Sequence, residues 1–136
     1  MLVELAIQDL ALIERATLTF GPGLNVITGE TGAGKSLLID ALELLLGQRG
    51  RSGMVRAGAP KARVEGRFLM PREGYGDLVA EWLAEHLPET LEDFEDEGGE
   101  ELELILTRAL GRDGRSRAHV NHRPVTQRML RELASR

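Results

Sequence analysis

Residues 24–46 of this 136-residue chain read LNVITGETGAGKSLLIDALELLL and decide its fold class. Residues 24–28 are a short apolar run with β-branched side chains, which predicts a buried strand. A glycine-rich loop follows at 29–36, and residues 35–46 predict a helix that ends at Gly47. A strand, a glycine loop and a helix in direct succession predict an α/β domain.

The loop at 29–36 matches the pattern G-x-x-x-x-G-K-[ST], which binds nucleotide phosphates. Glycines let the backbone approach phosphate oxygens closely, so that successive N–H groups form an anion-binding nest. The helix that follows adds the unpaired N–H groups and the positive dipole end of its first turn. The sequence therefore predicts an ATP-binding loop made of Gly29, Glu30, Thr31, Gly32, Ala33, Gly34, Lys35 and Ser36.

Two side chains of this loop have predicted roles of their own. The Lys35 ammonium would contact the β- and γ-phosphates of ATP, and the Ser36 hydroxyl would coordinate Mg²⁺. The alternative interpretation is a chance glycine-rich turn before a helix. The buried strand before the loop and the helix directly after it favour nucleotide binding, because the motif requires both.

The residues that would cleave a nucleotide are not evident in the sequence. Hydrolysis by a P-loop enzyme needs an acid at the end of a second apolar strand and a residue that positions water. The one apolar run that ends in an aspartate is 37–40, and it lies on the predicted helix rather than on a separate strand. We therefore expect this chain by itself to bind ATP and to have negligible ATPase activity.

The rest of the chain alternates between strand-like and helix-like segments. Strands are predicted at 2–8, 12–20, 62–70, 102–110 and 115–121, with turns at 21–23 and 111–114. A helix is predicted at 76–87 with Trp82 as its core anchor, and a last helix is opened by Pro124 and Thr126. The helix at 35–46 is apolar around most of its circumference, so we expect more than one layer to cover it.

The net charge of −5 is unevenly distributed along the chain. Residues 89–103 hold nine acidic residues and no basic one, and the remaining residues hold 13 acidic and 17 basic ones. We predict a flexible acidic insertion at about 88–101 on a lobe that is otherwise basic. The absence of cysteine, of a long apolar run and of a visible signal peptide predicts a cytoplasmic protein with no membrane partner.

The basic residues gather at 49–72 and 108–136, and fifteen of the seventeen are arginines. This distribution fits a surface for DNA phosphates, with Arg112, Arg115 and Arg117 as candidates, or ordinary solvated strand faces. Aromatic residues do not alternate with the arginines, so stacking on single-stranded bases is not supported. His119 and His122 lack further ligands at matching spacing and are interpreted as surface histidines rather than a metal site.

Several segments within and beyond the loop carry a family resemblance. They are ALIE at 11–14, GLNVITGETGAGKS at 23–36, SGMVR at 52–56 and GRDGRSRA at 111–118. On these segments the chain resembles the N-terminal head segment of RecN, a family of bacterial DNA-repair proteins related to the structural-maintenance-of-chromosomes (SMC) ATPases. Thr31, where many SMC relatives carry asparagine, favours the RecN family. The resemblance covers most of the chain and is weakest across about 71–101.

The resemblance implies an ABC-type P-loop head lobe over residues 1–136, with a mixed sheet and an antiparallel β subdomain, that is incomplete in this chain. Its implied partners are a long coiled coil and a C-terminal head lobe that holds the signature motif and the Walker B acid. A second head would complete an ATP-sandwiched homodimer. ATP binding and hydrolysis would then gate interaction with DNA during double-strand-break repair, at the nucleoid in the cytoplasm.

Two alternatives remain at the level of sequence. One is the ATP-binding lobe of another ABC-type ATPase, such as a transporter subunit, and the other is a small-molecule P-loop kinase. A long coiled-coil region after residue 136 would favour the RecN interpretation. A nearby signature motif without a coiled coil would favour a transporter subunit.

Overall fold

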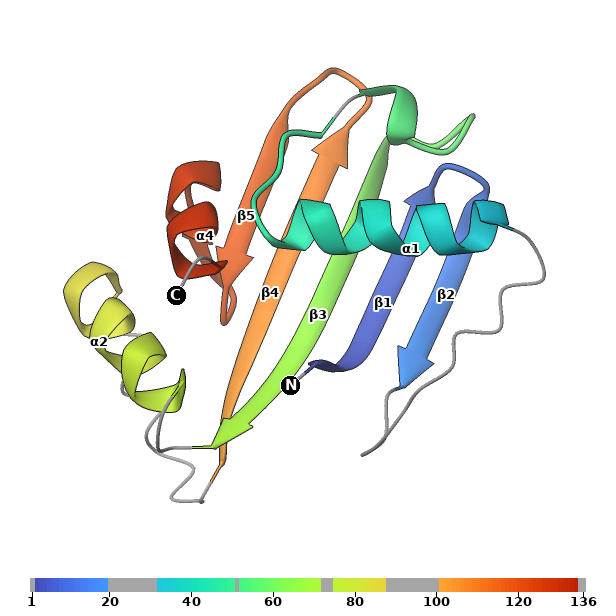
Figure 1. Ribbon diagram of the computed structural model, residues 1–136. Helices are drawn as coiled ribbons and strands as arrows, with labels where there is room; N and C mark the ends of the chain where they lie inside the picture. Colours follow the sequence, from blue (N-terminus) through green and yellow to red (C-terminus); the bar gives the residue numbers. More distant parts are fainter. Residues whose placement is uncertain (1, 20–31, 51, 72–74, 88–100, 135–136) are drawn as a thin grey trace.

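The structure, a computed structural model, describes residues 2–19, 32–50, 52–71, 75–87 and 101–134. Within these residues, strands form one sheet in the order β2-β1-β3-β4-β5-β6, and all neighbours are antiparallel (Figure 1). The strands are β1 (Leu2–Leu10), β2 (Ile13–Thr19), β3 (Lys61–Pro71), β4 (Glu101–Gly111), β5 (Ser116–Val120) and β6 (Arg123–Val125). The two 11-residue strands β3 and β4 pair along their whole length and form the centre of the sheet.

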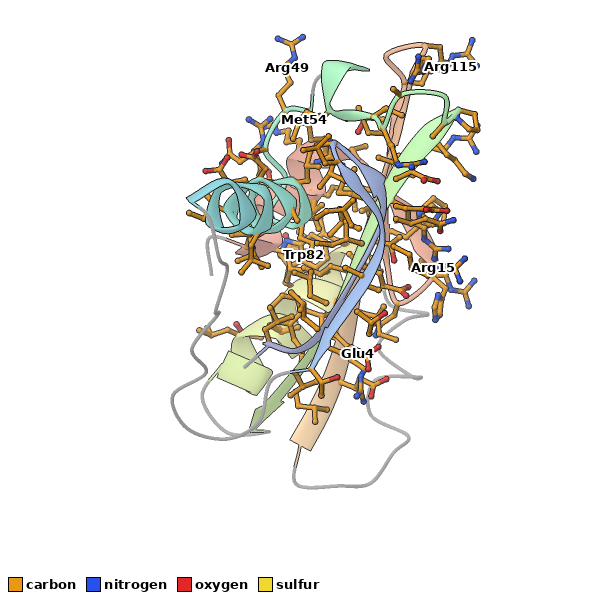
Figure 2. All side chains as sticks on the ribbon, turned by 90° about the vertical axis from the view of Figure 1, so that its right-hand side faces the viewer. Glu4, Arg15, Arg49, Met54, Trp82 and Arg115 are labelled. Atoms are coloured by element: carbon orange, nitrogen blue, oxygen red, sulfur yellow. The ribbon has the colours of Figure 1, made fainter. Side chains whose placement is uncertain are left out.

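The described helices lie on one face of this sheet, which we call the helix face (Figure 2). Helix α1 (Gly32–Leu45) crosses the strands, α2 (Tyr75–His86) packs against β3, and α4 (Gln127–Ala134) packs against β5. The opposite face, the open face, carries no helix from the part of the chain that the structure describes. No helix of that part is long and apolar enough to cross a membrane.

Side chains alternate across the central strands, as the period of two in a strand requires. In β4, Leu104, Leu106 and Leu110 are buried under the helices, while Ile105 and Ala109 are half-buried on the open face. The helix face therefore holds the hydrophobic core, and the open face meets solvent.

Helix α1 is covered by the sheet on one side only among the described residues. Its buried side chains, spaced three and four residues apart, are Leu38, Ala41, Leu44 and Leu45. Gly66 of β3 allows a close approach, because a Cβ there would lie 2.6 Å from Leu45 Cδ1. On the outer side, the side chains of Ile39 and Leu46 stay 54% and 41% exposed, so the second covering layer remains a prediction.

Most predicted elements are confirmed, with small changes of their bounds. The α/β class is confirmed, and Trp82 is fully buried in the core as predicted. Helix α1 begins at Gly32 rather than at residue 35, because the end of the glycine loop forms the first helical turn. The predicted strand 24–28, which would make the sheet mixed, and residues 88–100 of the acidic insertion lie outside the described residues.

The prediction that Pro124 opens the last helix is wrong. Pro124 lies in β6, opposite His119 of β5, and α4 begins at Gln127 with the Thr126 hydroxyl accepting a hydrogen bond from Met129 N at 3.0 Å. The hairpin exists because Asn121 and His122 both adopt positive φ, at 47° and 69°, which is the geometry of a two-residue hairpin turn. Asparagine favours this conformation, so Asn121 was the missed signal.

Candidate functional site

The predicted phosphate-binding residues fall at the start of α1. Residues 32–36 form its first turn, and Gly29, Glu30 and Thr31 lie outside the described residues. The first turn contains no acidic residue, so no side chain there opposes the positive end of the helix dipole. The unpaired N–H groups at the start of a 14-residue helix are the kind of group that binds a phosphate. The predicted roles of Lys35 and Ser36 toward ATP and Mg²⁺ stay predictions.

Helix α1 runs across the sheet so that its two ends have different surroundings. Its first residues lie over the β2 edge, and its last residues lie over β4 (Figure 1). The N-terminal end of α1 therefore lies at one edge of the sheet, while its C-terminal end meets the centre.

A buried arginine of β4 fastens the C-terminal end of α1. Arg108 is only 2% exposed, and its Nη1 donates hydrogen bonds to Leu44 O and Gln48 O, both at 2.9 Å. Its Nη2 donates to Ser116 Oγ on β5 at 2.5 Å. A cation at the C-terminus of a helix is stabilised by the negative end of the helix dipole and by the last carbonyl groups. Arg108 thus connects α1 to two strands.

Burial without a carboxylate partner makes the environment of Arg108 unusual. No acidic residue of the described segments pairs with it, and its Nε atom has no hydrogen-bond partner there. Loss of hydration on burial lowers the pKa of Arg108, because a charged group is poorly solvated in the protein interior. Hydrogen bonds to carbonyl and hydroxyl oxygens therefore stabilise the positive charge of Arg108.

Helix α4 holds the same end of α1 from the side. Gly47 follows α1 with φ of 91°, and its carbonyl accepts a hydrogen bond from Gln127 Nε2 at 3.0 Å. A Cβ on Gly47 would lie 2.7 Å from the backbone N of Arg131, so only glycine fits between the helices. The predicted helix stop at Gly47 is confirmed, and it is also a packing site.

The loop between α1 and β3 is clamped by two turns. Ala11 N donates to Met54 O at 2.6 Å and Arg56 N donates to Asp9 O at 2.8 Å, which fixes the loop to the β1–β2 turn. On the other side, Arg112 Nε donates to Ala59 O at 3.0 Å and Nη2 donates to Arg56 O at 2.7 Å. Arg112, a candidate for DNA contact by sequence, thus binds backbone carbonyls of its own chain.

The other basic candidates lie on the open face, near the β4–β5 turn. Arg115 and Arg117 line a hollow of about 690 Å³ that Lys61 also borders. Lys61 and Arg117 also border an adjoining hollow together with His119 and His122. Arg112 lines the first hollow as well, but its guanidinium already donates hydrogen bonds to backbone carbonyls of its own chain.

Sequence reasoning missed Arg108, although a signal for it exists. Its position is even-numbered in a strand whose other even positions are leucines, so the alternation alone places it on the buried face. A charged residue in that register needs hydrogen-bond partners inside the protein. Which partners it has depends on the helix that covers the strand, and the strand pattern does not contain that information.

The comparisons with known proteins agree with this architecture. Residues 4–120 match the family model described as AAA domain. The DNA repair protein RecN of Bacillus subtilis is 41% identical over 133 residues, covering 98% of this chain and 21% of that protein. RecN of Halalkalibacterium halodurans is 39% identical with the same coverages. The chain spans about a fifth of the length of the curated relatives it matches.

Solved structures support the fold. The crystal structure of an Smc head domain with an extended coiled coil, bound to the C-terminal domain of ScpA, from Pyrococcus furiosus matches with a TM-score of 0.70. The match covers 98% of this chain and 32% of that chain, at 22% sequence identity. The chain therefore belongs to the AAA domain family, and its resemblance to RecN is confirmed.

Proposed function

We propose that this chain is the ATP-binding lobe of a RecN-like ATPase that acts in recombinational repair of DNA double-strand breaks in the cytoplasm, at the nucleoid. The observation that carries the proposal is the identity of about 40% to proteins named DNA repair protein RecN over nearly the whole chain. That match favours the repair ATPase over a transporter subunit or a small-molecule kinase.

In this proposal residues 29–36 bind ATP. Backbone N–H groups of the loop and of the first turn of α1 surround the phosphates, Lys35 contacts the β- and γ-phosphates, and Ser36 holds Mg²⁺. The anchors at the other end of α1, Arg108 and Gly47, keep the helix in place. Bound Mg²⁺ would neutralise charge on the phosphates.

The remaining parts of the protein complete the site. The exposed Ile39 and Leu46 on the outer side of α1 fit a covering layer from a C-terminal head lobe. A coiled coil would connect the two lobes, and a second head would sandwich ATP in a homodimer whose formation gates DNA interaction. The lobe by itself lacks a Walker B acid in its sequence, so it would bind ATP without hydrolysing it.

The test is a titration of the protein with a fluorescent ATP analogue in the presence and absence of Mg²⁺. We expect saturable, Mg²⁺-dependent binding that Lys35→Ala weakens by roughly 10- to 100-fold, because charge-assisted hydrogen bonds to phosphate are lost. Lys61→Ala is the matched control, since Lys61 is the only other lysine of the chain and lies on the open face. Equal binding by the two variants, or no saturable binding by the unaltered protein, would refute the nucleotide site.

A further inference from the structure

We propose that the open face of the sheet binds the phosphate backbone of duplex DNA at a basic trough formed by Arg15, Lys61, Arg63, Arg115 and Arg117. The choice of DNA among polyanions rests on the proposed repair function. The location rests on the described side chains alone, and the trough lies on the face opposite α1. Figure 2 shows Arg15 and Arg115 projecting from the sheet on the side away from α1.

The register of the sheet places three of these arginines in one row. Gln8 of β1 is paired with Arg15 of β2 on one side and with Arg63 of β3 on the other. Ala109 of β4 is paired with Arg63 and with Arg117 of β5. With strands spaced about 4.8 Å apart, the row from Arg15 to Arg117 spans roughly 19 Å. That length matches about six base-pair steps of a duplex at ~3.4 Å each.

The small residue between two arginines leaves the row hollow. Ala109 lies between Arg63 and Arg117, and the same alanine lines both hollows at this end of the sheet. Lys61 and Arg117 border both hollows, and a third hollow at Gln8, Arg15 and Arg63 continues the depression toward β2. At Ala109 a backbone phosphate could therefore approach Arg63 and Arg117 without meeting a bulky side chain between them.

The charges of the trough are available to a ligand. Among the described residues, Arg15, Lys61 and Arg117 make no ion pair with an acidic residue. Arg63 and Arg115 have only exposed contacts with acids close in sequence, Glu65 at 3.5 Å and Asp113 at 3.7 Å. Such exposed ion pairs contribute little free energy, so DNA phosphates can replace the two acids as partners of Arg63 and Arg115.

The other end of the open face has the opposite character. Arg67 there pairs with Glu103 at 3.2 Å and lies 3.9 Å from Glu4, so its charge is already matched. The acid-rich sequence 89–103 joins β4 at Glu101, whereas the trough lies at the Gly111 end of that strand. The described acids of that sequence, Glu101 and Glu103, lie at the other end of this 11-residue strand, which is roughly 33 Å long, well beyond the ~8–10 Å over which salt water transmits charge effects.

A duplex fits the trough better than a single strand does. Single-strand binding surfaces combine cations with aromatic rings on which bases stack. The described side chains of Phe68 and Trp82 belong to the hydrophobic core or pack against it, so the rings that border the trough among the described residues are the imidazoles of His119 and His122. Cations without base-reading groups predict binding that is insensitive to sequence and strongly dependent on salt.

The test compares two double variants of the intact protein that remove the same charge. The double variant Lys61→Gln with Arg117→Gln removes from the trough two positive charges that have no acidic partner among the described residues. Arg67→Gln with Arg128→Gln removes two cations that already have acidic partners, since Arg128 lies 3.5 Å from Glu132. The probe is a fluorescent 30-base-pair duplex, titrated without nucleotide at several salt concentrations, with a single strand of the same length as a second probe.

We expect the trough double variant to reduce the slope of log K against log salt by about 1.8, since each phosphate contact contributes about 0.9. Its affinity for the duplex should fall at least about tenfold near 0.1 M salt, while the control pair changes it less than about twofold. Equal losses in the two variants, no loss in the trough variant, or tighter binding of the single strand would overturn the proposal.

Two further measurements distinguish a failure of DNA binding from a loss of folding and from a failure of the nucleotide site. Thermal unfolding reports whether a variant is folded. If the double variant does not fold, the single variant Arg117→Gln takes its place, and it should lower the slope of log K against log salt by about 0.9. Lys35→Ala should bind the duplex normally without nucleotide. If the nucleotide site fails its own test, the proposal of DNA binding at the trough is therefore unaffected. If the trough does not bind DNA, the proposal of a nucleotide site is likewise unaffected.

Discussion

The two faces of the sheet use arginine in opposite ways. Arg108 and Arg117 lie on neighbouring strands, yet Arg108 points under α1 and Arg117 points to solvent. The buried guanidinium has its hydrogen bonds to oxygens of the protein, whereas the exposed one has no acidic partner among the described residues. The comparison teaches that a residue's place in the period of two, not its type, separates a structural cation from one available to a ligand.

The largest expected effect concerns the buried cation. Arg108→Met keeps a similar volume but removes three hydrogen bonds, so the free energy of unfolding should fall by about 3 kcal/mol at ~1 kcal/mol per bond. Chemical denaturation measures this, and Ser116→Ala should cost about one third as much because it removes one of the three bonds. If Arg108→Met lowers the free energy of unfolding by less than about 1 kcal/mol, the cost of burying the charge offsets most of what its hydrogen bonds contribute.

A smaller effect is expected where α1 ends against α4. Gly47→Ala should cost about 2 kcal/mol, because the residue has positive φ and a Cβ would press on the Arg131 backbone. Gly58→Ala is the matched control, since Gly58 also has positive φ but has nothing within 4 Å of an added Cβ. Equal losses of unfolding free energy in the two variants would show that packing at Gly47 contributes nothing.

The smallest effect on stability should come from the open face. Arg67→Gln breaks two partly exposed ion pairs and should lower the unfolding free energy by no more than about 0.5 kcal/mol. Lys61→Gln should change it even less, because Lys61 has no ion pair with a described residue. Urea unfolding at low and high salt measures both, and a loss above about 1 kcal/mol for Lys61→Gln would contradict a free cation there.

Much of the fold follows from local sequence patterns. The strand-like segments at 62–70 and 102–110 and the glycine after α1 predicted elements that the structure confirms. Strand β6 was not predicted for two reasons. Pro124 suggested the start of a helix, and three residues are too few to show the alternation of a strand. The predicted roles of Lys35 and Ser36 remain predictions, and they came from a motif whose chemistry is local.

By itself, the sequence predicted a phosphate-binding loop, which stays a prediction, and it determined the helix that follows the loop and the strands after that helix. These features depend on residues close together in the chain, and local backbone preference and hydrophobic period express them. Only the tertiary structure decided that Arg108 fastens α1, that Arg112 clamps a loop, and that Arg15, Arg63 and Arg117 share one row. The physical reason is pairing register, because residues up to about a hundred positions apart come to share one row of the sheet only when strands align.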